Sequence, residues 1–119
     1  MAKILIVDDE KDIVSALEIY LKAEGYRVLS ACNGKEALAA AAREDVHLIL
    51  MDIMMPAMDG YQAARAIRGS GKKDAETIPI IAMTANAFAE DKRKTMEAGM
   101  DAHLSKPLNV PELMETIRK

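Results

Sequence analysis

The stretch that decides the fold runs from Leu48 to Gly60 and reads LILMDIMMPAMDG. Its first four residues form a continuous apolar run, which is typical of a strand covered on both faces in the middle of a parallel sheet. The run stops at Asp52, and Pro56 with Asp59 indicates a loop before the next helix. Open α/β sheets bind their ligands at the carboxyl ends of their strands. Asp52 is therefore a candidate functional carboxylate, although taken alone it would more simply end the strand or brace the loop.

Four other segments have the composition of short strands, and helical patterns separate them. These segments are residues 4–7, 27–31, 78–83 and 102–105. The helix after the first strand is expected to bury the face formed by Ile13, Ala16, Leu17, Tyr20 and Leu21, because these residues recur at helical spacing.

Capping residues mark several of the expected helix ends. Gly25 is expected to end the first helix in a left-handed conformation. Asn33 with Glu36 resembles a capping box for the second helix, and Asp59 with Gln62 can cap the third. The fourth helix is expected to reach residue 99, and the last to begin near residue 109.

Five strands alternating with five helices predict an α/β fold in which a doubly wound parallel sheet is covered on both faces. The segments 27–31 and 102–105 are the weakest strands and are expected at the sheet edges. The strand order 2-1-3-4-5, known from flavodoxin-like folds, satisfies this expectation. At 119 residues the chain is long enough for one sizeable core and too short for two, so we expect a single domain over residues 1–119.

Composition narrows the possible functions. The formal net charge of −3 argues against direct nucleic-acid binding, which favours basic chains. No apolar run approaches the roughly 20 residues of a membrane span, so no membrane insertion is expected. Cys32 is the only cysteine, which excludes an internal disulfide and makes a reducing cytoplasm the expected location. We expect Cys32 to be a small packing residue rather than a redox switch.

Five polar residues follow the expected strands where each of them ends. Asp8 and Asp9 follow residues 4–7, Asp52 follows the central apolar run, Thr84 follows residues 78–83, and Lys106 follows residues 102–105. Because parallel strands end at the same edge, these side chains should converge. Three converging carboxylates repel by several kcal/mol at a protein-like dielectric, so a cation must offset them. Magnesium suits such a site, since it prefers oxygen ligands and accepts an incomplete protein cage.

This set of residues has what phosphoryl transfer to a carboxylate requires. Catalysis of that reaction rests on positioning and on neutralising charge, and an ionised aspartate can be the nucleophile. Lys106 would add a positive charge and Thr84 a hydroxyl donor. Each residue has a simpler alternative: Asp8 or Asp9 could cap the first helix, Thr84 could cap the fourth, and Lys106 could be an ordinary surface lysine.

Over essentially its whole length, the sequence resembles the receiver domain of two-component response regulators. The motifs that carry the resemblance are ILIVDDE at 4–10, LILMDIMMPAMDG at 48–60, IPIIAMTA at 78–85 and AGMDAHLSKPL at 98–108. The resemblance implies that Asp52 is the phosphoacceptor. It also implies that Asp8, Asp9, Asp52 and the Met54 backbone carbonyl bind Mg²⁺, for which Mn²⁺ could substitute.

The resemblance assigns roles to three further residues. Thr84 and Lys106 would contact the phosphoryl group, and the Lys106–Pro107 peptide bond would be cis. His103 occupies the switch position, which is usually aromatic, and a half-buried strand histidine is the alternative. A phosphorylated chain would then change the surface of its fourth helix, fifth strand and fifth helix.

The partners implied are a histidine kinase or a histidine phosphotransfer protein as donor, and an effector domain or protein as target. MTANAF at 83–88 and GMDAHLSKPL at 99–108 are similar to receivers of hybrid histidine kinases. No effector domain fits within the chain, so it is expected to be a stand-alone regulator or a receiver from a larger protein. Such a chain is a signalling phosphoacceptor, which catalyses only its own phosphorylation and dephosphorylation.

Two other function classes remain as alternatives. A small phosphohydrolase could use an aspartyl nucleophile, but haloacid-dehalogenase-like enzymes place it in an Asp-x-Asp motif after the first strand and carry a large cap insertion. Flavin binding would need a Ser/Thr/Gly-rich phosphate loop after the first strand and more aromatic residues than the 3% present.

Overall fold

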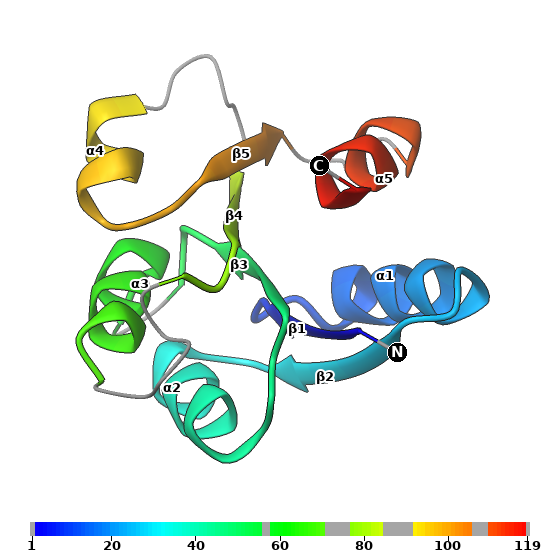
Figure 1. Ribbon diagram of the computed structural model, residues 1–119, viewed down its shortest axis with the longest axis horizontal. Coiled ribbons are helices and arrows are strands. Elements are labelled where there is room, and N and C mark those ends of the chain that lie inside the picture. Colours follow the sequence, from blue (N-terminus) through cyan, green and yellow to red (C-terminus); the bar gives the residue numbers. More distant parts are fainter. Residues whose placement is uncertain (1, 56–57, 71–76, 85–91, 106–109, 119) are drawn as a thin grey trace.

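The computed structural model describes residues 2–55, 58–70, 77–84, 92–105 and 110–118, which form a three-layer α/β fold (Figure 1). Five parallel strands make one sheet in the order β2-β1-β3-β4-β5. The strands are β1 (Lys3–Val7), β2 (Arg27–Ala31), β3 (Leu48–Asp52), β4 (Ile80–Thr84) and β5 (Ala102–Ser105). The helices are α1 (Lys11–Ala23), α2 (Gly34–Arg43), α3 (Gly60–Arg68), α4 (Lys92–Glu97) and α5 (Val110–Arg118). The predicted fold class and strand order are confirmed.

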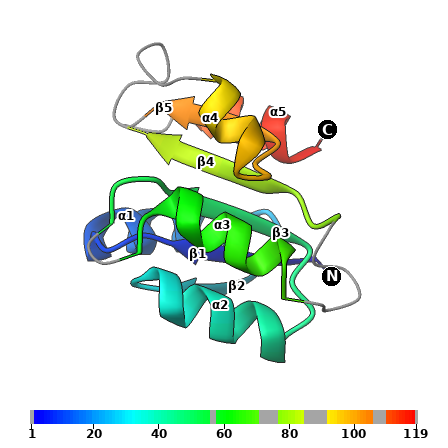
Figure 2. The same ribbon diagram turned by 90° about the vertical axis from the view of Figure 1, so that its left-hand side faces the viewer.

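Helices cover both faces of the sheet. Figures 1 and 2 show α1 and α5 on one face and α2, α3 and α4 on the other. Leu5 and Val7 pack into the core beneath α2 and α3, whereas Ile4 and Ile6 pack into the core beneath α1 and α5. The central strands therefore have no solvent-facing side, which explains why their sequences are continuously apolar rather than alternating.

The helix caps confirm the predictions made from single residues. Gly25 has a φ of 92°, the left-handed conformation that glycine adopts at little cost. The Asn33 Oδ1 accepts a hydrogen bond of 2.9 Å from the Glu36 amide. Only this half of the predicted capping box is present, because the Glu36 carboxylate accepts from the Cys32 amide rather than from that of Asn33. Asp59 and Gln62 form a complete capping box, in which each side chain accepts a hydrogen bond from the other residue's amide. These caps fix where α2 and α3 begin relative to the preceding strands.

Three local expectations are wrong. Helix α1 buries Leu17 and Leu21, but Ala16 is exposed and 48% of the Tyr20 surface is accessible. Cys32 is exposed rather than packed in the core. Strand β4 begins at Ile80 rather than at residue 78, because Pro79 has no amide hydrogen to donate to a strand ladder.

Two remaining expectations concern the fourth helix and membrane insertion. Helix α4 is described from Lys92, and the expected start of the fourth helix lies outside the described residues. Within the part of the chain that the structure describes, none of the helices is both long enough and apolar enough to cross a membrane.

Candidate functional site

Three carboxylates and one hydroxyl meet at the carboxyl edge of the sheet. Asp8 and Asp9 directly follow β1, Asp52 is the last residue of β3, and Thr84 is the last residue of β4. The register places Val7 beside Met51 and Asp52 beside Met83, so the three strands end at nearly the same level. Asp8, Asp52 and Thr84 are 1%, 3% and 1% exposed, whereas Asp9 is open to solvent. The predicted convergence of the three carboxylates is present, and Thr84 ends the neighbouring strand at the same edge.

The three carboxylates form a donor set that fits a small divalent cation. One oxygen of each of Asp8, Asp9 and Asp52 lies within 4.8 Å of the others. Magnesium binds oxygens at about 2.1 Å, so two of its ligands are at most about 4.2 Å apart. The carboxylate oxygens would therefore have to draw slightly closer together than 4.8 Å to bind the ion at the same time. Hard anionic oxygens are also the ligands that magnesium prefers, so both the chemistry and the spacing fit.

Local hydrogen bonds orient the two buried carboxylates. The Glu10 amide donates to Asp8 Oδ1 over 2.9 Å, and the Met54 amide donates to Asp52 Oδ1 over 3.2 Å. In both cases the donor is two residues further along the chain, as in an Asx turn. Glu10 occupies the N-cap position of α1, and no side chain caps this position, so the alternative in which Asp8 or Asp9 caps the helix is wrong. Both aspartates are thereby available to the site at the strand ends.

The loop after Asp52 depends on close backbone packing that sequence reasoning missed. The Gly60 amide donates to the Ile53 carbonyl over 3.0 Å, and the Ile53 amide donates to the Met83 carbonyl over 3.0 Å. A Cβ on residue 60 would lie 2.5 Å from the Asp52 carbonyl oxygen. Gly60 therefore lets α3 begin directly against the backbone of the candidate phosphoacceptor. The Asp-Gly pair in the sequence suggested a turn but not this contact.

Met54 lies beside Asp52 with its side chain directed away from the core. It is 71% exposed, and its backbone belongs to the loop that starts at the end of β3. The resemblance assigned a metal-ligand role to its carbonyl, whereas the hydrogen bond to Asp52 Oδ1 gives its amide a role that the sequence did not suggest.

Thr84 and His103 lie on the same face of the sheet. Strand β5 pairs His103 with Ala82 and Ser105 with Thr84. Residues that pair across adjacent strands, and residues two apart on one strand, share a face. Ala82 belongs to the core beneath α2 and α3, so Thr84 and half-buried His103 face the helices of that side. Lys106 and Pro107 lie outside the described residues, as does the peptide bond between them.

A cavity of about 280 Å³ adjoins Asp8 on its β2 side and contains Cys32 and Glu36 in its wall. The Cys32 Sγ donates to Glu36 Oε2 over 2.8 Å. This hydrogen bond is the main reason why the pKa of the Cys32 thiol is raised and that of the Glu36 carboxyl is lowered. A thiol held in its protonated form is a weak nucleophile, which argues against a redox role for Cys32.

Comparisons with known proteins agree with the geometry of the site. The sensor histidine kinase GacS of Pseudomonas protegens is 36% identical over 118 residues, in a match that covers 98% of this chain and 13% of GacS. The chain thus spans a small part of the length of this relative.

Two solved structures are similar over nearly the whole chain. The chemotaxis protein CheY4 of Vibrio cholerae superposes with a TM-score of 0.92 at 33% identity, covering 99% of this chain and 97% of CheY4. The receiver domain of the sensor histidine kinase PA1611 from Pseudomonas aeruginosa has a magnesium ion coordinated in its active site cleft. It superposes with a TM-score of 0.88 at 37% identity, covering 98% of this chain and 94% of that domain.

The family model described as the response regulator receiver domain matches residues 4–118. Apart from Lys3, the first residue of β1, this match includes all five strands and the edge at which Asp8, Asp9, Asp52 and Thr84 lie. The chain therefore belongs to the response regulator receiver domain family, the receivers of two-component phosphorelay signalling.

Proposed function

We propose that this chain accepts a phosphoryl group on Asp52 in a reaction that requires magnesium, and that it acts as a single receiver domain. The observation that carries the proposal is the cluster of Asp8, Asp9 and Asp52 oxygens within 4.8 Å at the ends of adjacent strands. Asp52 is the preferred nucleophile because it ends the fully buried strand β3 and its carboxylate is oriented by the Met54 amide. The magnesium ion in the cleft of the PA1611 receiver supports the metal assignment.

Each residue of the site would have its own role in phosphoryl transfer. Asp8 and Asp9 would hold the cation with Asp52, and the Met54 carbonyl would be a further ligand. A bound Mg²⁺, or Mn²⁺ in its place, supplies positive charge that offsets the negative charge of the phosphoryl oxygens. An Asp52 oxygen forms the new bond to phosphorus while the bond from phosphorus to the donor's histidine nitrogen breaks, and that nitrogen keeps the electron pair. Thr84 and Lys106 then contact the oxygens of the transferred group.

The same chemistry defines the partners. The donor is a phosphohistidine on a kinase or a phosphotransfer protein in the cytoplasm, and the target is an effector domain or protein. The chain catalyses only its own phosphorylation and dephosphorylation. The phosphate is read out when Thr84 moves toward it and His103, on the same face of the sheet, takes up the vacated space.

Labelling with acetyl phosphate and Mg²⁺, followed by mass spectrometry of the intact protein, tests this function. We expect one phosphoryl group per chain, no label in the presence of a chelator, and no label in Asp52→Asn. Asp45→Asn is the matched control, because Asp45 is an exposed aspartate outside the site. Normal labelling of Asp52→Asn would overturn the assignment. Many turnovers of small phosphoesters per chain would instead favour the phosphohydrolase alternative.

A further inference from the structure

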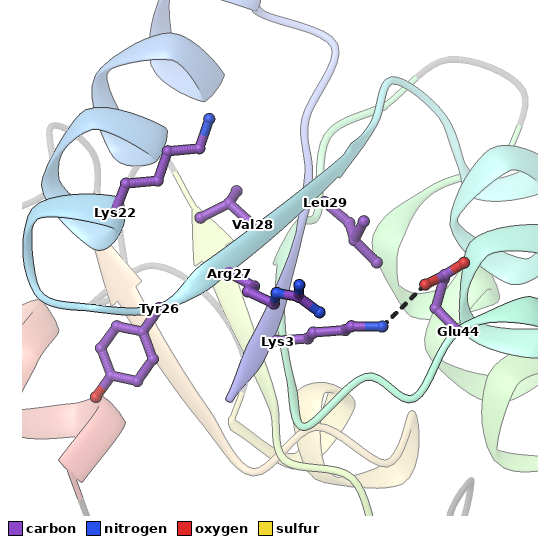
Figure 3. A pocket seen from close by; sticks show the side chains of 7 residues that line it. All are labelled: Lys3, Lys22, Tyr26, Arg27, Val28, Leu29 and Glu44. Carbon is purple, nitrogen blue, oxygen red and sulfur yellow. Dashed lines mark hydrogen bonds and ion pairs between the residues drawn. The ribbon is translucent and has the colours of Figure 1, made fainter. Parts of the chain in front are cut away.

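A second cavity, of about 420 Å³, lies along the open edge of β2 and away from the carboxylate cluster. Lys3 and Arg27 line it from the amino ends of β1 and β2, Lys22 from α1, and Glu44 from the end of α2 (Figure 3). The half-buried side chains of Val28 and Leu29 also contribute to the lining. We call this cavity the β2 edge groove.

The groove exposes backbone groups that can pair with another strand. Among the described strands, β2 pairs only with β1. The Arg27 amide donates to the Ala2 carbonyl, and the Ala31 carbonyl accepts from the Asp8 amide, so these residues turn their backbone groups toward β1. Backbone direction alternates along a strand, so the amides and carbonyls of Val28 and Ser30 face the open edge. Such an edge is a template for an added strand.

The charge of the groove is predominantly positive. Lys3 and Arg27 are direct partners in the β1–β2 register, and like charges in that arrangement repel. Glu44 pairs with Lys3 over 3.0 Å, and Lys22 has Glu18 at 3.7 Å on its own helix. Arg27 is exposed and makes no ion pair within the residues that the structure describes. An added carboxylate beside Arg27 would therefore relieve the repulsion.

We propose that the β2 edge groove binds an extended acidic segment of a partner protein, which adds to the sheet as a strand beside β2. Its backbone would pair with Val28 and Ser30, and the acidic side chain opposite Arg27 would face the guanidinium, with the Lys3 ammonium one strand further in. A second copy of this chain is a poorer occupant, since pairing two β2 edges brings the cations of one groove against those of the other. The positive charge of this edge thus favours acidic partners and also disfavours self-association.

Titration of the ¹⁵N-labelled chain with a capped peptide that alternates glutamate and valine tests the proposal. We expect the largest amide shifts at Val28 and Ser30, and weaker binding at higher salt. Arg27→Glu should raise Kd at least tenfold and Arg27→Gln by a smaller factor, while circular dichroism shows that both variants remain folded. Lys35→Glu, the same charge reversal at an exposed position on α2, should leave Kd unchanged.

Several results would overturn the proposal. The absence of amide shifts with millimolar peptide, or equal binding of a peptide with lysine in place of glutamate, would exclude an acidic strand. An unchanged Kd in both Arg27 variants would exclude Arg27 as the contact. A dimer of the chain that forms through β2 without peptide would show that a second copy is the occupant. Asp52→Asn should bind the peptide like the original chain, so failure of the phosphoacceptor assignment and failure of this proposal are distinguishable.

Discussion

Replacing Gly60 by alanine tests whether α3 is packed directly against the backbone of Asp52. The new Cβ would lie 2.5 Å from the Asp52 carbonyl oxygen and 2.8 Å from Ile53 Cα. An ordinary contact is at least 3.4 Å, so the loop must move by roughly 0.9 Å. Both neighbouring atoms belong to the backbone, which cannot turn aside as a flexible side chain can.

We expect Gly60→Ala to lower the free energy of unfolding by about 2–3 kcal/mol. Overpacking of this kind costs roughly 1–3 kcal/mol, and weakening the hydrogen bond from the Gly60 amide to the Ile53 carbonyl adds about 1 kcal/mol at most. Because Asp52 must shift with its carbonyl, labelling by acetyl phosphate should also slow. Urea unfolding followed by circular dichroism measures the first effect, provided that the slope with denaturant is unchanged.

Gly69→Ala is the matched control for this substitution. Gly69 ends α3 with a φ of −90°, and the nearest atom to an added Cβ is the Arg65 carbonyl oxygen at 3.4 Å. The Gly69→Ala substitution should change the free energy of unfolding by less than about 0.5 kcal/mol. If Gly60→Ala were as stable as Gly69→Ala, the close packing of α3 on the Asp52 loop would be refuted.

Three further outcomes are expected. Magnesium at a hundredfold excess over its Kd should raise the free energy of unfolding by about 2.7 kcal/mol. Asp9→Ala should lose most of that gain, and an undiminished gain in thermal or urea unfolding would exclude Asp9 as a ligand. Thr84→Ala should still accept phosphate, but the NMR shifts that beryllofluoride causes around His103 should shrink, and full-size shifts would mean that the switch bypasses Thr84. Glu36→Gln should lower the raised pKa of the Cys32 thiol, because the carboxylate that accepts its hydrogen bond is lost. The thiol should then react faster with a disulfide reagent at neutral pH, and an unchanged rate would show that this hydrogen bond does not control its reactivity.

Strand positions and the site edge could be predicted because their physical causes are local. β1, β3 and β4 are buried on both faces, so after Lys3 at the start of β1 every residue in them is apolar until the chain reaches the carboxyl edge. The same edge collects Asp8, Asp52 and Thr84, since parallel strands all end there. Locating the end of each strand in the sequence is therefore enough to predict that these residues lie at one edge of the sheet.

Which face of α1 is buried was harder to predict. The helix has more apolar residues than its contact with the sheet can cover, and Ile19 and Tyr20 remain 70% and 48% exposed. Periodicity shows that a helix is amphipathic, but it does not show how wide the buried stripe is. Helical spacing therefore predicts Ala16 and Tyr20 in the core, although both are exposed.

Individual side-chain contacts between helices and loops far apart in the sequence could not be predicted. The Arg68 Nη2 donates to the Gly99 carbonyl oxygen over 2.6 Å and to Asp101 Oδ2 over 3.0 Å, which joins α3 to the turn before β5. Asp101 Oδ2 also accepts from the Ile80 amide over 2.9 Å, so the same carboxylate fixes the start of β4. No periodicity or local motif brings Arg68 and Asp101 together, because their proximity depends on how the helices and strands pack.

The most direct test of the central claim is to map the phosphorylated residue itself. The chain is incubated with acetyl phosphate and Mg²⁺, reduced with borohydride, which converts an aspartyl-phosphate into homoserine, and digested for tandem mass spectrometry. The account predicts homoserine at position 52 alone, and none when magnesium is chelated. Homoserine at position 8 or 9, or equal conversion at position 52 without a divalent cation, would contradict it.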